Sequence, residues 1–373
     1  MNDDPTLGQV TARVMCKTRP VAQLPILQFV ARPGILDLGW GHPRPELLPV
    51  AEWRAATAAM LDTVGWPALT YGYAAGPGPL VEWLAARNGT DPAGIFVTAG
   101  ASQALTLLCQ LLTEPGDTVL VDTPTYHLAL RIFRDHGLRL ATPRDLSGAG
   151  VAKFLYTVPT FGNPTGRSLS ADARISLVRA AQRSGVPVVE DDTYRELVYD
   201  GTAPPSLWEL SGGDGVIRVG SFAKTVGPGL RLGWIDAGSE LVRRLVGLGY
   251  VDSGGGVNHE TAFTMATFAA SGEYEGHLAR LRAAYREQRD ALAGQLGVPG
   301  PAGGWFLWLR LPAGRTGSAL LPVAEAHGVS FVEGSRFTVD GSGDDHIRLS
   351  FSMLPPAELA EAARRLQSAL AAD

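Results

Sequence analysis

The sequence contains little lysine, cysteine or charge. Lys17, Lys153 and Lys224 are the only lysines among 32 basic residues, so chemistry that needs a primary amine has three candidates. Cys16 and Cys109 are the only cysteines in 373 residues, which favours a reducing compartment over a disulfide-linked secreted fold. Charged residues make up 18% of the chain and hydrophobic residues 45%, a balance that excludes a disordered protein.

Long apolar runs and an excess of positive charge are also missing. No run approaches the roughly 18 residues that a membrane-spanning helix needs, and the acidic start of the chain does not resemble a signal peptide. The net charge of −5 provides no field that would attract nucleic acid or an anionic membrane. We therefore expect a cytoplasmic protein that binds neither nucleic acid nor membrane.

Short apolar strands alternate with helical patterns from about residue 80 onward. This alternation predicts an α/β fold with a mainly parallel sheet and helices on both faces. The pattern changes near residue 272, which predicts a smaller α+β domain. We expect a proline-rich arm over 1–45 that packs on this small domain, a large domain over 46–271 and the small domain over 272–373. The expected strands of the large domain cover 95–98, 118–121, 154–157, 187–190 and 217–220.

The lysine best placed for chemistry is Lys224, in the segment SFAKTVGPGLR that covers 221–231. It directly follows an expected strand, and its neighbours are apolar or glycine. Such surroundings lower the pKa of an amine and favour a lysine that forms imines. An ordinary surface lysine is the alternative, but the scarcity of lysine elsewhere in the chain favours the chemical role.

Three further loops follow strands of the same expected sheet, and ligands of such sheets bind beyond the carboxyl ends of the strands. Asp191 begins the segment DDTY; without other ligands at metal spacing, a protonated ring nitrogen is a plausible partner, and a solvated acidic turn is the alternative. Asn163 lies in an NPTG turn and presents an amide at that edge. Gly100 to Gln103 join a strand to a helix, where free amide groups can bind a phosphate.

Seven motifs in this chain occur in the order found in pyridoxal-phosphate enzymes of the aspartate aminotransferase superfamily (fold type I, class I/II). The chain most resembles the kynurenine/2-aminoadipate aminotransferase branch, from about residue 37 to 370. The motifs are Tyr71-Gly72, Gly100-Ala101-Ser102-Gln103, Pro124-Thr125-Tyr126, Asn163-Pro164-Thr165-Gly166, Asp191-Asp192-Thr193-Tyr194, the segment from Ser221 to Arg231, and Arg348-Leu349-Ser350-Phe351.

The resemblance implies a large cofactor-binding domain, a smaller domain, and a role for each matching residue. Lys224, Asp191 and Tyr126 would be catalytic: the lysine holds pyridoxal 5′-phosphate as a Schiff base, the aspartate pairs with the ring nitrogen and the tyrosine stacks on the ring. The cofactor would contact Ala101, Ser102, Gln103, Tyr126, Asn163, Asp191, Tyr194, Ser221, Lys224 and Arg231, with Tyr71 supplied by the partner subunit of a homodimer. The substrate would contact Arg348, Trp40, Gly41 and Asn163, and no metal is implied.

The resemblance further implies an aminotransferase that exchanges the amino group of an amino acid, or of an amino-acid conjugate, with a keto acid. A second pyridoxal-phosphate reaction on the same scaffold stays open, namely elimination from, or decarboxylating oxidative deamination of, an S-substituted cysteine in natural-product biosynthesis. Pocket geometry, rather than these motifs, decides which bond at Cα breaks. The motifs also do not select the substrate side chain.

Other classes of protein match fewer features of the sequence. Ser221 and Lys224 fit the Ser-x-x-Lys pattern of penicillin-recognising enzymes, but Ser-Asp-Asn and Lys-Thr-Gly motifs are absent from the sequence. Ser102 lies in a turn that resembles a hydrolase nucleophile elbow, without the His-Gly-Gly loop that supplies an oxyanion hole. A ligand-sensing regulator of this fold would carry a winged helix, for which the residues before Asp37 are too few.

Overall fold

The structure is a computed structural model that describes residues 32–143 and 152–372. Most of the expected arm, residues 1–31, lies outside the described residues. Every element named below belongs to one compact unit, which begins at Gly34. Among the described residues, no helix is long and apolar enough to cross a membrane.

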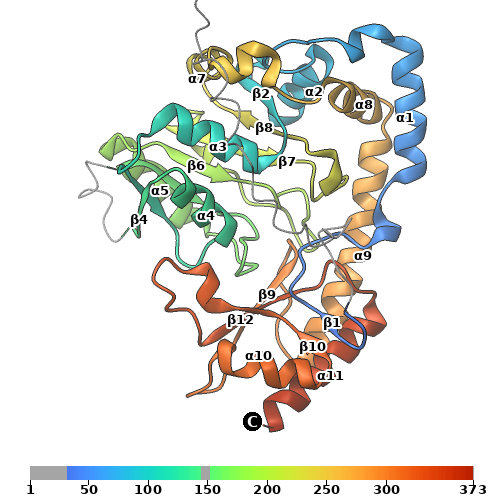
Figure 1. Cartoon of the computed structure of the whole chain (residues 1–373), viewed down its shortest axis with the longest axis vertical. Coiled ribbons are helices and arrows are strands. Elements are labelled where there is room, and N and C mark those ends of the chain that lie inside the picture. The colour runs from blue at the N-terminus through green and yellow to red at the C-terminus, as the bar shows by residue number, and fades with distance from the viewer. Residues whose placement is uncertain (1–31, 144–151, 373) are drawn as a thin grey trace, which may run out of the picture. The chain divides into compact units, whose positions relative to one another are not determined.

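A seven-stranded sheet forms the centre of the fold, in the order β2-β8-β7-β6-β5-β3-β4 (Figure 1). All neighbours pair in parallel except β8, which is antiparallel to both β2 and β7. The mainly parallel sheet expected from the sequence is therefore confirmed. The strands are β2 (Ile95–Thr98), β3 (Thr118–Val121), β4 (Arg139–Ala141), β5 (Ala152–Thr157), β6 (Val188–Asp191), β7 (Val216–Ser221) and β8 (Gly233–Asp236).

Helices cover both faces of this sheet, as its apolar strands require. Side chains of α3, α4 and α7 pack on one face in a single apolar cluster, and Figure 1 shows α3 and α4 crossing that face. Side chains of α5 and α6 pack on the other face, and α2 and α8 contribute to a further apolar cluster. The helices up to this point are α1 (Val50–Thr63), α2 (Gly78–Asn88), α3 (Ala101–Leu112), α4 (His127–Asp135), α5 (Ala171–Ser184), α6 (Leu207–Ser211), α7 (Ser239–Val246) and α8 (His259–Ala270).

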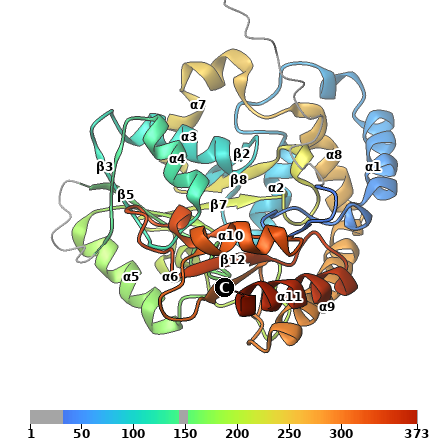
Figure 2. The same cartoon turned by 60° about the horizontal axis from the view of Figure 1, so that its bottom comes forward.

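A second, antiparallel sheet of order β11-β12-β9 forms from residues after 300. It lies with α10 and α11 in the part of the molecule that comes forward in Figure 2. The short strand β1 reaches this region from the N-terminal side of the chain and pairs in parallel with β10. The elements are β1 (Leu36–Asp37), β9 (Phe306–Arg310), β10 (Val329–Ser330), β11 (Val332–Glu333), β12 (His346–Ser350), α9 (Glu273–Leu296), α10 (Gly317–Ala326) and α11 (Pro356–Ala372).

The direction of the strands fixes which loops meet. Strands β2, β3, β5, β6 and β7 run the same way, so their carboxyl ends share one edge of the large sheet. Because β8 runs the opposite way, its amino end and the loop before it lie at the same edge. Five strand ends and one strand start thus bring separate loops of the sequence to one site.

Candidate active site

Most residues expected at the site lie at this carboxyl edge of the large sheet. Asp191 is the last residue of β6, Ser221 is the last residue of β7, and Lys224 follows three residues later. Asn163 lies in the loop after β5, and Arg231 lies in the loop that leads into β8. The remaining ones are Tyr126 at the start of α4, Tyr194 after β6, and Ala101, Ser102 and Gln103 in the first turn of α3.

Lys224 is partly buried between the two sheets' loops. Its Nζ lies 3.4 Å from the carbonyl oxygen of Gly41 and 4.6 Å from the centre of the Trp305 ring. The pKa of Lys224 is lowered to about 8, mainly by burial and also by the nearby charges of Arg348 and Arg231, while the charge of Asp191 opposes them. A lysine with such a pKa has a substantial fraction of free, nucleophilic amine near neutral pH.

Asp191 is buried, and both of its carboxylate oxygens accept hydrogen bonds. Its Oδ2 accepts a hydrogen bond of 2.8 Å from the Tyr156 hydroxyl. Its Oδ1 accepts from the hydroxyl of Thr193 and, at 3.3 Å, from the backbone amide of the same residue. Burial raises the pKa of Asp191, whereas these hydrogen bonds and the charge of Lys224 lower it. The carboxylate is thus held in one orientation at the sheet edge.

Arg348, on β12, is buried and reaches across to the large sheet. Its Nη1 donates to Oδ1 of Asn163 at 3.0 Å and its Nη2 to the carbonyl of Gly39 at 2.6 Å. Its Nε has no hydrogen-bond partner among the described residues. The guanidinium carbon lies 4.3 Å from the Phe306 ring centre and 4.9 Å from that of Phe337. The two rings and two acceptors fix a cation that still has an unused donor.

The first turn of α3 is open to an anion. Its N-cap is Gly100, and no side chain of the described residues caps its amide groups. Arg231 lies against this helix start and donates through Nη2 to the carbonyl of Ala99 at 3.2 Å. Gly100 has φ +93°, and a Cβ there would lie 2.8 Å from the same Nη2. The glycine therefore permits both the turn and the close approach of the guanidinium.

Gln103 and Ser221 are engaged mainly in shaping their own loops. The Gln103 side chain accepts from the Ala99 amide at 2.6 Å and donates to the Tyr250 hydroxyl at 3.3 Å. The Ser221 hydroxyl accepts from the amide of Ala223 at 3.1 Å. Both residues lie at the carboxyl edge of the sheet, and their side chains hold the turns on which the neighbouring amides are presented.

Two tyrosines lie near the carboxylate and the arginine. Burial and the charge of Asp191 raise the pKa of Tyr126 to about 12, against the opposing charges of Arg348 and Arg231. Burial also raises the pKa of Tyr194. The Tyr194 ring packs edge-on against Trp305 and Phe306, with ring centres 6.0 and 5.8 Å apart. Both phenols therefore remain protonated at neutral pH and can act as hydrogen-bond donors.

The remaining expected residues are Trp40, Gly41 and Tyr71. Gly41 contacts Lys224 through its carbonyl, and the indole of Trp40 donates to Asp37 at 3.1 Å within the same segment. Tyr71 is not brought to these residues within one chain: its side chain is 85% exposed. A Cβ on Gly254 would lie 2.6 Å from the Tyr71 ring, so the ring lies against the turn η6 (Val251–Gly255).

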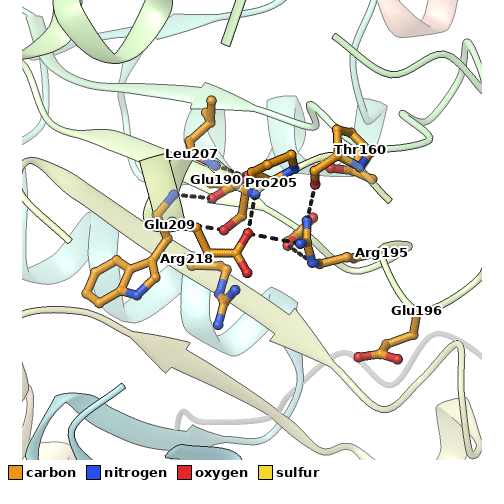
Figure 3. Close-up of polar contacts among 12 residues, drawn as sticks. Thr160, Glu190, Arg195, Glu196, Pro205, Leu207, Glu209 and Arg218 are labelled. Carbon is orange, nitrogen blue, oxygen red and sulfur yellow. Dashed lines mark hydrogen bonds and ion pairs between the residues drawn. The ribbon is translucent and has the colours of Figure 1, made fainter. Parts of the chain in front are cut away.

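A buried polar network on the opposite face of β6 supports these loops (Figure 3). Glu190 accepts from the amides of Leu207 and Trp208, at 2.8 and 3.0 Å, and so anchors the start of α6. Arg174, which is fully buried, donates to the carbonyl of Pro159 at 2.6 Å and to the hydroxyl of Thr160 at 3.0 Å. The network therefore fixes the loop that ends at Asn163 from behind the sheet.

Sequence reasoning missed several residues that contact this site. Tyr156 and Thr193 bind Asp191, and Trp305, Phe306 and Phe337 face Lys224 and Arg348. A signal existed for Tyr156, because a tyrosine inside a buried parallel strand needs a partner for its hydroxyl. The aromatic contacts of Arg348 had no such signal, because they depend on how the small sheet meets the large one.

Within 32–143 and 152–372, no three histidine, cysteine, aspartate or glutamate side chains group in a way that could hold a metal ion. What the site offers instead is an amine, a buried carboxylate, a buried guanidinium and an anion-binding helix start.

Comparisons with known proteins agree with a site built from these four groups. The family model "Aminotransferase class I and II" matches residues 33–366. The 2-aminoadipate transaminase of Thermus thermophilus is 35% identical, over 92% of each chain. The crystal structure of the α-aminoadipate aminotransferase LysN from Thermus thermophilus, complexed with N-(5′-phosphopyridoxyl)-L-leucine, has a TM-score of 0.83 at 34% identity, covering 91% of this chain and 93% of that one. The kynurenine aminotransferase of Pyrococcus horikoshii has a TM-score of 0.83 at 28% identity, covering 91% of both chains.

These relatives confirm the fold and the resemblance inferred from the sequence. They are transaminases by name, so they favour transamination over the elimination or decarboxylation that the motifs alone left open. The chain belongs to the class I and II aminotransferase family: it is an aminotransferase of fold type I, and its cofactor is pyridoxal 5′-phosphate.

Proposed function

We propose that Lys224 binds pyridoxal phosphate covalently and that the residues around it complete a site for an α-amino acid. The observation that carries the proposal is the meeting of Lys224 with Asp191, Asn163 and Arg348, which come from three different loops and from a strand of the second sheet. These residues supply an amine, a partner for a protonated ring nitrogen, an amide and a carboxylate receptor.

The open helix start fits the phosphate of the cofactor. The amides of Ala101 and Ser102, with Gln103 behind them, lie at the positive end of the α3 dipole. Arg231 adds a full positive charge beside them, and Ser221 adds a hydroxyl at the end of β7. Three independent kinds of anion-binding group thus converge on one turn.

The buried carboxylate fits the ring of the cofactor. Asp191 is positioned to keep a proton on the ring nitrogen by electrostatic attraction. Asn163 and Tyr194 would hydrogen-bond the ring hydroxyl, and Tyr126 would stack on the ring. When bound, the cofactor accepts the amino group and spreads the negative charge left when a proton leaves Cα.

The chain itself holds the amino acid and moves the proton. Arg348 would bind the α-carboxylate, using the Nε that has no hydrogen-bond partner in the part of the chain that the structure describes, and Asn163, Trp40 and Gly41 would line the substrate side. The amine of Lys224, once released, would accept the Cα proton and return it in the second half of the reaction. A keto acid would then take up the amino group.

Cofactor loading is expected to depend on pH through Lys224. Because the pKa of this amine is lowered to about 8, its free form rises with pH and levels off above that value. In cofactor-free enzyme, the rate at which added pyridoxal phosphate becomes bound should be about a hundredfold slower at pH 6 than on the plateau. Stopped-flow absorbance measures this rate. A rate that still climbs towards pH 10 would mean an unperturbed lysine and would contradict the proposed environment.

We also propose that two copies of the chain form a homodimer with shared active sites. Supporting this, an exposed apolar segment runs from η2 (Trp66–Leu69) towards α2, and soluble monomers rarely expose such a group of large side chains. Trp66 is 77% exposed, Tyr71 85% and Tyr73 76%. In the proposed dimer, Tyr71 would donate to the phosphate bound by the other subunit.

Exchange of Tyr71 for phenylalanine tests that contact. Loss of one hydrogen bond to a charged phosphate should weaken cofactor affinity about ten- to a hundredfold. Tyr73→Phe is the matched control, because it removes a hydroxyl from an equally exposed tyrosine two residues away and should leave affinity unchanged. Cofactor titration measures both variants, and sedimentation measures the mass of the assembly. A monomer that binds cofactor as tightly as a dimer would refute the shared site.

Two broader proposals follow the same reasoning. The division into an arm over 1–45, a large domain over 46–271 and a small domain over 272–373 is supported by the separate origins of the two sheets and by the β1–β10 pair. A cytoplasmic location is supported by the low cysteine content and by the free thiol of Cys109, and a role in amino-acid metabolism or biosynthesis is supported by the similarity to a 2-aminoadipate transaminase.

A further inference from the structure

We infer that Tyr156 is a positioning residue for the ring-binding carboxylate, and that with Thr193 it keeps Asp191 charged and correctly aimed. This inference rests on the proposed role of Asp191. Tyr156 lies on β5, in none of the motifs that carry the family resemblance, and it does not itself need to touch the cofactor. Tyr156 would influence the cofactor only by orienting the Asp191 carboxylate and stabilising its charge.

The pairing of β5 with β6 places the two side chains together. Tyr156 is in register with Val189, and Asp191 lies two residues further along β6, on the same face of the sheet as Val189. The Tyr156 hydroxyl therefore meets Oδ2 of Asp191 from the neighbouring strand, at 2.8 Å. The contact is built by strand register and does not depend on a flexible loop.

The tyrosine is held in place and stays a donor. Its side chain is fully buried, and the Phe133 ring packs edge-on against it with ring centres 5.4 Å apart. Burial and the charge of Asp191 raise its pKa well above the usual value, so the hydroxyl keeps its proton. A buried phenol in this position can only donate to the carboxylate, which favours the charged form of the acid.

The carboxylate keeps capacity for the cofactor. An ionised carboxylate has about four acceptor positions, and Tyr156 and Thr193 together use three of them. One remains for a protonated ring nitrogen. The other ionisable groups acting on Asp191 are Lys224, which stabilises its charge, and the protonated phenols of Tyr126 and Tyr194.

Loss of the Tyr156 hydroxyl should change how a proton is shared between the ring nitrogen of the cofactor and Asp191. In Tyr156→Phe the carboxylate becomes more basic, so the proton on the ring nitrogen shifts towards an oxygen of Asp191 and the ring accepts charge less well. For one hydrogen bond to a charged group, we expect kcat/KM to fall about ten- to a hundredfold. Packing changes alone could also lower activity, so the decisive readout is the protonation of the ring nitrogen.

The experiment uses holoenzyme loaded with pyridoxal phosphate that carries ¹⁵N in its ring. The ¹⁵N chemical shift separates the protonated from the unprotonated nitrogen. In the wild type we expect the protonated value, and in Tyr156→Phe a shift towards the unprotonated one. Tyr285→Phe is the matched control, since it removes a buried hydroxyl that has no hydrogen-bond partner among the described residues; it should retain the wild-type shift.

Two further variants separate a failure of this inference from a failure of the proposed role of Asp191. Thr193→Val removes the other hydroxyl donor and should shift the signal in the same direction, which keeps the test usable if Tyr156→Phe does not fold. Asp191→Asn reports on the proposed function itself. A wild-type shift in both Tyr156→Phe and Thr193→Val, with a moved signal in Asp191→Asn, would overturn this inference alone. A wild-type shift in Asp191→Asn would refute the proposed role of the carboxylate.

Discussion

Replacement of Lys224 by alanine is expected to abolish transamination, with a loss of more than about a thousandfold in kcat. The variant lacks both the amine that would hold the cofactor and the base that would move the proton at Cα. Bound cofactor should also lose the visible absorbance that a covalent imine confers. Steady-state kinetics with an amino acid and a keto acid, together with absorbance spectra, measure the two effects.

Lys153→Ala provides the matched control. The side chain of Lys153, on β5, is 45% exposed, and its Nζ lies 3.4 Å from a carboxylate oxygen of Asp117. Such a surface pair contributes at most about 1 kcal/mol to stability, so its removal should leave turnover within about twofold. Undiminished turnover in Lys224→Ala, or an equal loss in both variants, would be incompatible with the assignment of Lys224.

Replacement of Arg348 by lysine should raise the KM for the amino acid and lower kcat/KM about a hundred- to ten-thousandfold. Arginine presents a planar fork to a carboxylate, and lysine presents a single point charge. Loss of two hydrogen bonds to a charged group corresponds to a loss in this range. The lysine would also leave Oδ1 of Asn163 and the carbonyl of Gly39 without their present donor.

Arg310→Lys is the control for Arg348. Arg310 lies on β9, next to β12 in the same sheet, but its side chain is 79% exposed and only approaches Asp345. Its exchange should leave KM and kcat unchanged. If Arg348→Lys raised KM no more than Arg310→Lys, the α-carboxylate would have to bind elsewhere.

The sequence was sufficient to place the candidate site, because the residues proposed for it lie at or after the ends of strands. Asp191 ends an apolar strand, Lys224 and Asn163 lie in loops that follow two others, and parallel strands bring their carboxyl ends together without further information. The expected strands also agree closely with the observed ones: 95–98 and 118–121 are unchanged, 154–157 and 217–220 each gain two residues, and 187–190 is shifted by one residue.

The structural features that could not be predicted from the sequence depend on tertiary packing. Strand β8 begins with Gly233 after a glycine-rich turn and ends with Asp236, and both residue types are rare in strands, so its pattern did not indicate one. It nevertheless sets where Arg231 lies, because it runs antiparallel to its neighbours. The bond between Tyr156 and Asp191 likewise required the register of β5 on β6, which apolar periodicity does not specify.

The aromatic surroundings of the two cations were equally unpredictable from the sequence. Trp305 and Phe306 read as the interior of a strand, but in the structure Trp305 faces Lys224 and Phe306 faces Arg348. Both contacts join the small sheet to the edge of the large one. A side chain whose sequence pattern predicts a place in the hydrophobic core can therefore line a site that two sheets form together.

The attachment of the cofactor to Lys224 can be tested directly, because the chain has only three lysines. Borohydride adds hydride to a carbon–nitrogen double bond and makes a reversible attachment permanent. Holoenzyme would be reduced, digested and analysed by mass spectrometry. We expect the phosphopyridoxyl group on the peptide that contains Lys224 and on no other. The group on a peptide containing Lys17 or Lys153, or on none, would contradict the proposed site.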